Sequence, residues 1–305
     1  MTTTHAPGRV CVLGSANVDD VREVDRFPRP GETVFARSRT RVPGGKGLNQ
    51  AIAAARAGAA TALRARIGRD EEGRMLRAAA AGAGVDTAGM LEVPAATGSA
   101  AILRDGAGEN SIVVAGGANA AFTELTADDL AAVAAADVLL LQGEVPVVAL
   151  EQAAVHARDH GTRVILTPAP VQEFGADLLS AVDLLVPNEH EACALAGLED
   201  PRAAARALTG TRRRVLITLG GRGAALVDPS GDVQEIPPVP MRAVDTTGAG
   251  DAFCGALAAR LAAGAELPEA ARWAAAAAAL SVTREGSATS PAREEVEQLL
   301  ERPPG

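Results

Sequence analysis

The segment Val244-Asp-Thr-Thr-Gly-Ala-Gly-Asp251 places small residues and a carboxylate directly before an apolar stretch. Phe253, Leu257 and Leu261 recur at helical spacing, so we expect a helix to begin near Asp251. Small residues let several backbone N–H groups converge there, and the helix dipole adds about half a positive charge. Such a site binds a phosphoryl group, and Asp251 could accept the proton of an attacking hydroxyl. The alternative is that Asp251 only caps the helix.

A second glycine segment, Pro43-Gly-Gly-Lys-Gly47, precedes another expected helix at 48–56 and would let a polar ligand approach the backbone. It lacks the Walker A pattern, and no GxGxxG follows the strand expected at 9–14, which argues against a nicotinamide-dependent oxidoreductase. A glycine turn before a surface helix is the alternative. The segment contains Lys46, the only lysine among 29 basic side chains, where a compact ammonium differs from an arginine fork.

Composition excludes several other classes. The chain has 305 residues, 48% of them hydrophobic and 22% charged, as in globular proteins. A net charge of −9 and only five Phe, one Trp and no Tyr argue against a nucleic-acid partner. The three cysteines form no CxxC pair and the four histidines lack ligand spacing, so neither disulfides nor zinc are expected. Without a signal peptide or an apolar span of about 20 residues, we expect a cytoplasmic protein and no membrane partner.

Short apolar runs alternate with alanine-rich segments at helical spacing. This order predicts an α/β fold with a mostly parallel sheet covered on both faces. The expected strands are 9–14, 138–141, 164–166, 184–186 and 215–219, and the expected helices include 130–136, 150–158 and 203–208. Segments 18–42 and 97–116 break this rhythm and are interpreted as a small antiparallel β sheet that forms a lid. Residues 1–305 are therefore expected to form one domain that carries this lid.

Further motifs match a known family along nearly the whole chain. They are LGSANVD at 13–19, GGKGLNQ at 44–50, VPNEHEA at 186–192, VLITLGGRG at 215–223 and VTREGSATS at 282–290. With the GAGD motif, they make the chain resemble the ribokinases of the PfkB family of sugar and nucleoside kinases. The resemblance implies a ribokinase-like three-layer sandwich with a β lid, and ATP-dependent phosphorylation of D-ribose at O5.

The resemblance also implies roles for individual residues. Asp251 would be the base and touch the sugar, and the backbone of Gly248, Ala249 and Gly250 would stabilise the moving phosphoryl group. The other implied sugar-binding residues are Asn17, Asp19, Gly45, Lys46, Asn49 and Glu144. Without the resemblance, Asn17 is an ordinary turn residue and Glu144 a solvated loop carboxylate. Asp20, which follows Asp19, leaves the finer sugar preference open.

The nucleotide and cation sites follow from the same resemblance. Asn188 and Glu191 match an NxxE motif implicated in placing Mg²⁺ and phosphates, although the same pattern is typical of a helix cap. The other implied ATP-binding residues are Thr218, Gly220, Gly221, Arg222 and Gly223, together with Gly250. A monovalent cation, usually K⁺, would bind mostly to backbone carbonyls at Asp245, Thr247, Ser281, Arg284, Gly286 and Ser290.

Two functional alternatives stay open at this point. One is a PfkB-family kinase for 2-deoxyribose, another sugar or a nucleoside, and the scarcity of aromatic side chains disfavours a nucleoside. The other is a non-catalytic sugar- or nucleotide-binding protein. The resemblance further implies a homodimer that pairs through the β lid, which would cover an exposed sheet edge.

Overall fold

The computed structural model describes residues 7–106 and 109–301, in which nine strands form a central sheet in the order β13-β12-β11-β10-β9-β8-β1-β4-β5. Their bounds are β1 Arg9–Leu13, β4 Ala60–Gly68, β5 Met90–Val93, β8 Val138–Gln142, β9 Arg163–Thr167, β10 Leu184–Leu185, β11 Arg214–Thr218, β12 Ala224–Val227 and β13 Val233–Ile236. Pairing is parallel from β5 to β11 and antiparallel between β11, β12 and β13. The predicted mostly parallel sheet is confirmed.

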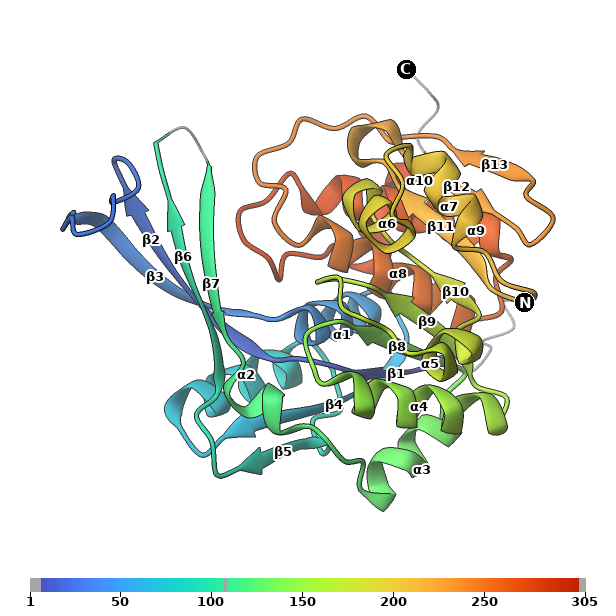
Figure 1. Ribbon diagram of the computed structural model, residues 1–305, viewed down its shortest axis with the longest axis horizontal. Helices are drawn as coiled ribbons and strands as arrows, with labels where there is room; N and C mark the ends of the chain where they lie inside the picture. Colours follow the sequence, from blue (N-terminus) through green and yellow to red (C-terminus); the bar gives the residue numbers. More distant parts are fainter. Residues whose placement is uncertain (1–6, 107–108, 302–305) are drawn as a thin grey trace.

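Helices cover both faces of this sheet, as the continuous apolar strands require (Figure 1). One layer holds α1 Lys46–Arg56, α2 Glu71–Gly82, α8 Ala249–Ala262, α9 Leu267–Ser281 and α10 Arg293–Leu300. The other holds α3 Ala127–Ala135, α4 Val147–Asp159, α5 Ala176–Ala181, α6 Glu189–Ala196 and α7 Pro201–Ala207. Alternate residues of β1 serve the two cores: Val10 and Val12 face the first layer, Cys11 and Leu13 the second.

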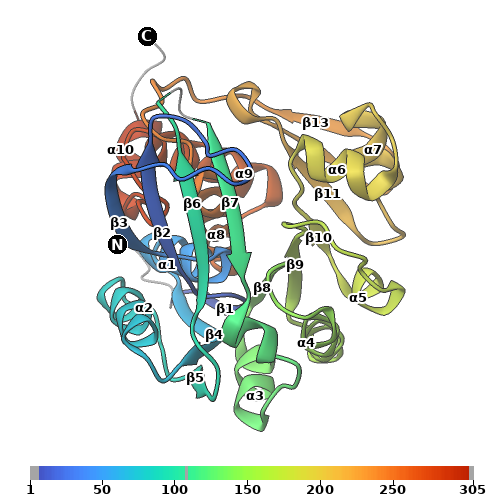
Figure 2. The ribbon, with the colours of Figure 1, turned by 60° about the vertical axis from the view of Figure 1, so that its left-hand side comes forward.

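A smaller sheet projects from one edge of this body (Figures 1 and 2). It consists of β2 Asn17–Val24, β3 Ala36–Gly44, β6 Gly98–Arg104 and β7 Asn110–Ala115, in the order β3-β2-β6-β7. These strands occupy the two segments predicted to form the lid. The two outer pairings are antiparallel as expected, whereas β2 and β6 at the centre run parallel because both strands leave the body in the same direction.

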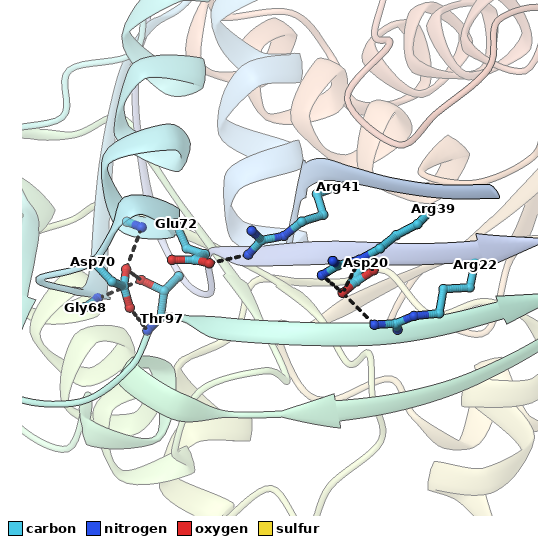
Figure 3. A network of polar contacts seen from close by, with 9 residues as sticks. Asp20, Arg22, Arg39, Arg41, Gly68, Asp70, Glu72 and Thr97 are labelled. Carbon is cyan, nitrogen blue, oxygen red and sulfur yellow. Dashed lines mark hydrogen bonds and ion pairs between the residues drawn. The ribbon is translucent and has the colours of Figure 1, made fainter. Parts of the chain in front are cut away.

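Polar contacts attach the base of the lid to the body (Figure 3). Asp70, the N-cap residue of α2, accepts hydrogen bonds from the backbone N and the hydroxyl of Thr97 at 2.8 and 2.6 Å. The Thr97 hydroxyl in turn accepts from the backbone N of Gly68 at 2.9 Å. Arg41 on β3 forms an ion pair with Glu72 on α2. These contacts therefore attach the lid to α2 and to the end of β4.

The described residues contain no helix with both the length and the apolar character that crossing a membrane demands.

Helix α8 packs directly against α1 at Gly255. A Cβ atom there would lie 2.4 Å from the carbonyl oxygen of Gln50 and 2.5 Å from the Cβ of Ala53. We expect Gly255→Ala to lower the free energy of unfolding by about 1–3 kcal/mol, because the two helices must separate. Gly82→Ala is the control, since a Cβ at that helical position meets no described atom within 4 Å. Urea denaturation checks this, and equal stability of the two variants would contradict it.

Candidate active site

Asp251 lies in the first turn of α8, against a cavity of about 200 Å³. The cavity opens where the carboxyl ends of β9, β10 and β11 meet the start of α8, the edge at which open α/β sheets bind ligands. Eight of the residues implicated by sequence line it: Lys46, Asn188, Glu191, Thr218, Gly248, Ala249, Gly250 and Asp251. Thr167, Thr246 and Cys254 also line it, and the sequence had not singled them out.

The start of α8 is built for an approaching ligand. Gly248, its N-cap residue, has a φ of 75°, and a Cβ there would lie 2.3 Å from the carbonyl oxygen of Ser287. The helix begins at Ala249, slightly before the predicted start, and no described side chain caps it. Asp251 is 7% exposed, and its carboxylate accepts hydrogen bonds from Asn49 and Gln50 of α1 instead of from the first backbone N–H groups of α8. The alternative that Asp251 merely caps α8 is therefore wrong.

The Asp251 carboxylate is held by amides of α1. Asn49 Nδ2 donates to Oδ2 at 3.1 Å, and Gln50 Nε2 donates to Oδ1 at 2.9 Å. Burial raises the pKa of Asp251, whereas Lys46 and the two amide donors lower it and so offset part of that effect. Burial alone would lower the pKa of Lys46, but attraction to Asp251 and Glu144 raises it above its usual value. A cation and a carboxylate thus face each other where a phosphoryl group could pass.

The implied sugar residues gather beside this pair, at the junction of body and lid. Burial, together with repulsion from Glu144 and Asp251, raises the pKa of Asp19 to about 6. Glu144 accepts from the backbone N of Lys46 at 3.0 Å and from the Ser15 hydroxyl, which fixes its carboxylate. This excludes the solvated loop carboxylate as a description of Glu144.

Amide groups complete the sugar side. Asn17 is buried, and its Oδ1 accepts from Asn119 Nδ2 at 2.7 Å, so it is more than a turn residue. Asn49 Oδ1 is buried without a partner among the described residues, so an acceptor remains unused beside the Asp251 carboxylate. Gly45 has a φ of 91°, and a Cβ there would lie 2.7 Å from the backbone N of Asn17.

Asp20 does not belong to this group. Its carboxylate pairs with Arg39 at 2.7 Å and Arg22 at 3.0 Å along the lid strands (Figure 3). Successive residues of a strand point to opposite faces, so Asp20 lies on the face opposite to Asp19, the residue implied in sugar binding.

Asn188 and Glu191 form a reciprocal cap at the start of α6. Glu191 N donates to Asn188 Oδ1 at 2.8 Å, and Asn188 N donates to Glu191 Oε2 at 2.9 Å. The helix-cap alternative is therefore correct about their local contacts, although both residues also line the cavity. Burial raises the pKa of Glu191.

The glycine segment after β11 lies outside the lining of the cavity. Thr218 N donates to the carbonyl of Pro187 at 2.9 Å and so lies next to Asn188. The residues that follow, Gly220, Gly221, Arg222 and Gly223, make no part of the cavity lining. Arg222 instead forms an ion pair with Glu189 on the surface.

The residues implied for a monovalent cation lie in the loop before α8 and from the end of α9 onwards, and Asp245 joins these two segments. Its carboxylate accepts from Thr247 N at 2.9 Å and from Gly286 N at 3.1 Å, and Arg104 of the lid approaches it to 4.0 Å. The other three implied residues are occupied locally: the Ser281 hydroxyl donates to the Ala278 carbonyl, Arg284 pairs with Glu295, and the Ser290 carbonyl accepts from Arg56. The described residues include no group of three or more His, Cys, Asp or Glu suited to a metal.

Comparison with known proteins identifies the family. The model of pfkB family carbohydrate kinases matches residues 8–294. The chain belongs to the PfkB family of carbohydrate kinases. A ribokinase of Haemophilus influenzae is 40% identical over 299 residues, covering 95% of this chain and 97% of that protein. A ribokinase of Bacillus subtilis is 37% identical, covering 95% and 99%.

Solved structures agree with this assignment. The ribokinase of Arabidopsis thaliana complexed with ribose and ATP matches with a TM-score of 0.91 and 34% identity, covering 98% of this chain and 100% of that chain. A ribokinase of Thermotoga maritima matches with a TM-score of 0.89 and 36% identity, covering 97% and 100%. The family and the fold class predicted from the sequence are both confirmed.

Sequence reasoning about this PfkB kinase missed the residues behind the site. Ser15 and Asn119 fix Glu144 and Asn17, while Gln50 and Gln142 lie behind Asp251. Three of them carried a signal, since Ser15, Gln50 and Asn119 fall inside motifs shared with the family, Asn119 in GGANA at 116–120. Gln142 lies in no such motif, so only the fold brings it to Gln50.

We expect the charge of Asp19 to lower the stability of this PfkB kinase and to improve its binding of sugar. Its folded pKa of about 6 lies above the unfolded value, so its charge lowers stability above pH 6, and that effect disappears as the pH falls towards 4. We expect Asp19→Asn to raise the free energy of unfolding at pH 7.5 by about 1–3 kcal/mol, with the gain shrinking below pH 6. The variant should also raise the KM for sugar. Urea denaturation at several pH values measures the first effect, and a pH-independent difference would contradict it.

Proposed function

We propose that this protein is an ATP-dependent kinase that transfers the γ-phosphoryl group of ATP to O5 of D-ribose, giving ribose 5-phosphate and ADP. The observation that carries the proposal is the buried Asp251 carboxylate at the open start of α8, facing Lys46 and the hydroxyl-binding groups of Asp19 and Asn49. The named relatives are ribokinases, and the Arabidopsis structure holds ribose and ATP.

Each group then has a chemical task. Asp19 and the free Oδ1 of Asn49 accept hydrogen bonds from sugar hydroxyls and direct O5 towards Asp251. Asp251 takes the O5 proton as the bond from O5 to the γ-phosphorus forms and the bond to the β,γ-bridging oxygen breaks, releasing ADP. Lys46 and the backbone of Gly248 to Gly250 stabilise the negative charge on the moving phosphoryl group. The lid excludes water, which limits wasteful hydrolysis of ATP.

Two cations complete the proposal. Mg²⁺ fits beside Glu191 and Asn188, because it usually takes one or two carboxylates together with substrate phosphates, whose charge it neutralises. K⁺ fits the loops joined by Asp245, where backbone carbonyls suit a weakly held monovalent ion, and binding would order the approach to Gly248. Use of ATP also supports the cytoplasmic location expected from the sequence.

The alternatives differ in specific features. 2-Deoxyribose presents the same O5 and is separated from ribose only by its missing hydroxyl. A nucleoside is less favoured, because aromatic side chains make up only 2% of the chain and a base gains from stacking. A binding protein without activity would not need the buried Asp251 carboxylate beside the half-buried Lys46.

Turnover should depend on Asp251 and on the sugar. We expect Asp251→Asn to lower kcat by about 10²–10⁴-fold with little change in stability, because an amide cannot take the O5 proton. Release of ADP is measured with ribose, 2-deoxyribose, fructose or adenosine, in potassium or choline chloride. Asp128→Asn, at an exposed position of α3, is the control. Full turnover by Asp251→Asn, or no ADP with any sugar, would refute the function, and equal rates in both salts would refute the role of K⁺.

Lys46 should not tolerate exchange for arginine. We expect Lys46→Arg to lower kcat/KM at least about tenfold, because a planar guanidinium replaces a compact ammonium in a confined site. Arg74→Lys, at an exposed position of α2, is the matched control and should behave as wild type. Steady-state kinetics measure this effect. An unchanged kcat/KM for Lys46→Arg would refute the proposed role of Lys46 in the site.

The lid is also our candidate for a homodimer interface. All six residues of β7 are exposed, it forms one edge of the small sheet, and its Val113 is 70% exposed. We expect light scattering to give twice the chain mass of 30.8 kDa, and Val113→Asp to give the single mass. Val148→Asp on α4 is the control. A monomeric wild type would refute this proposal.

A further inference from the structure

Two glutamines without a role in the mechanism above lie in line behind Asp251. Gln50 on α1 and Gln142 at the end of β8 are both fully buried. Gln50 Nε2 donates to Asp251 Oδ1 at 2.9 Å, and Gln142 Nε2 donates to Gln50 Oε1 at 2.8 Å. Gln142 Oε1, at the far end, is buried without a partner among the described residues. The three side chains form one chain of hydrogen bonds that ends on the carboxylate.

Two glycines leave the space that these glutamines occupy. A Cβ at Gly14 would lie 1.9 Å from Gln142 Oε1, and a Cβ at Gly255 would lie 2.4 Å from the backbone oxygen of Gln50. An unpartnered buried amide oxygen is unfavourable, and an apolar side chain in place of Gln142 would avoid it. The fold therefore retains a polar group that packing alone does not require.

The charge on Asp251 sets the direction of every amide in the chain. An ionised carboxylate can only accept hydrogen bonds, so Gln50 must present its NH₂ to Asp251 and its oxygen to Gln142. Gln142 must then present its own NH₂. Each hydrogen bond polarises the next, which strengthens the donor that reaches the carboxylate without adding a further charge to the site.

We infer that Gln50, backed by Gln142, is a positioning residue that orients the Asp251 carboxylate towards the attacking hydroxyl and keeps it ionised. The inference rests on the proposed role of Asp251 as the base. Asn49 holds the other carboxylate oxygen and is also implied in sugar binding, whereas neither glutamine is among the residues implied in sugar or nucleotide binding, and both are fully buried outside the cavity lining. Their effect therefore reaches the substrate only through Asp251.

Other ionisable groups face Asp251 from every side and remain in place when Gln50 is changed. They are Lys46 on α1, Asp19 on β2, Glu144 after β8, Glu191 on α6 and Cys254 on α8. Burial raises the pKa of Cys254 to about 12, so its thiol is neutral at working pH. Since burial already raises the pKa of Asp251, loss of the Gln50 donor should raise it further.

The test is the pH dependence of kcat in the full-length kinase with saturating ribose and ATP. We expect Gln50→Leu to move the acidic limb of the profile up by about 1–2 pH units, the effect of one hydrogen bond to a charged group. Turnover on the acidic side of the wild-type limb should fall about tenfold or more and recover at higher pH, while the KM for ATP stays the same. Gln234→Leu, at an exposed position of β13, is the control and should leave the profile unchanged.

Two further variants separate positioning from packing. Gln142→Leu should shift the limb in the same direction but less, and the double variant should match Gln50→Leu alone, because Gln142 acts through Gln50. Gln50→Glu has nearly the same shape as the wild type and, when ionised, repels Asp251. It should therefore move the limb further than Gln50→Leu, even if the leucine variant folds poorly.

Specific results would overturn the inference. A profile lowered equally at all pH values in both Gln50 variants would mean a packing role only. Independent, additive effects of Gln50→Leu and Gln142→Leu would mean that the chain of hydrogen bonds is not coupled. An inactive Asp251→Asn beside an unshifted Gln50→Glu would reject this inference and leave the proposed function standing, whereas an active Asp251→Asn would reject the base itself.

Discussion

The burial of one carboxylate, that of Asp251, is the constraint on which the rest of the site depends. A charge removed from water needs compensation, and here α1 provides most of it through the ammonium of Lys46 and the amides of Asn49 and Gln50. Because these groups belong to the first two turns of one helix, α1 must pack tightly against α8. Gly255 permits that approach, since it has no Cβ to meet the backbone of α1.

The junction of β1 and β2 explains how two sheets share one site. β1 belongs to the buried central sheet and β2 to the lid, and the connection between them runs past the start of α1. Asn17 and Asp19 therefore have their backbone in the lid, while the Asn17 amide accepts a hydrogen bond from Asn119 and the Asp19 carboxylate lies against Gly44, just before α1. The contact of Asp70 with Thr97 and the ion pair of Arg41 with Glu72 anchor the same lid on α2. The residues proposed to bind sugar thus lie where the lid meets the body.

Local patterns predicted much of this arrangement. The apolar runs at 138–141 and 164–166 identified β8 and β9, because a strand buried on both faces must be apolar throughout. The glycines before Asp251 indicated the uncapped helix start. The two lid segments were likewise visible as a break in the alternation of strands and helices. The parallel pairing of β2 with β6 could not be predicted from the sequence, because it depends on the directions in which two distant segments leave the body.

By itself, the sequence determined the family, the order of the elements and the residues that could carry chemistry, because each is encoded in short motifs and local periodicity. Only the tertiary structure decided what each polar side chain contacts. It turned Asp20 to the arginines of the lid and Asp19 towards Asp251, joined Asn188 to Glu191 in a cap, and aligned Gln142 behind Gln50. Hydrogen bonds between residues far apart in the chain form only after the helices and sheets have packed, so no local pattern contains them.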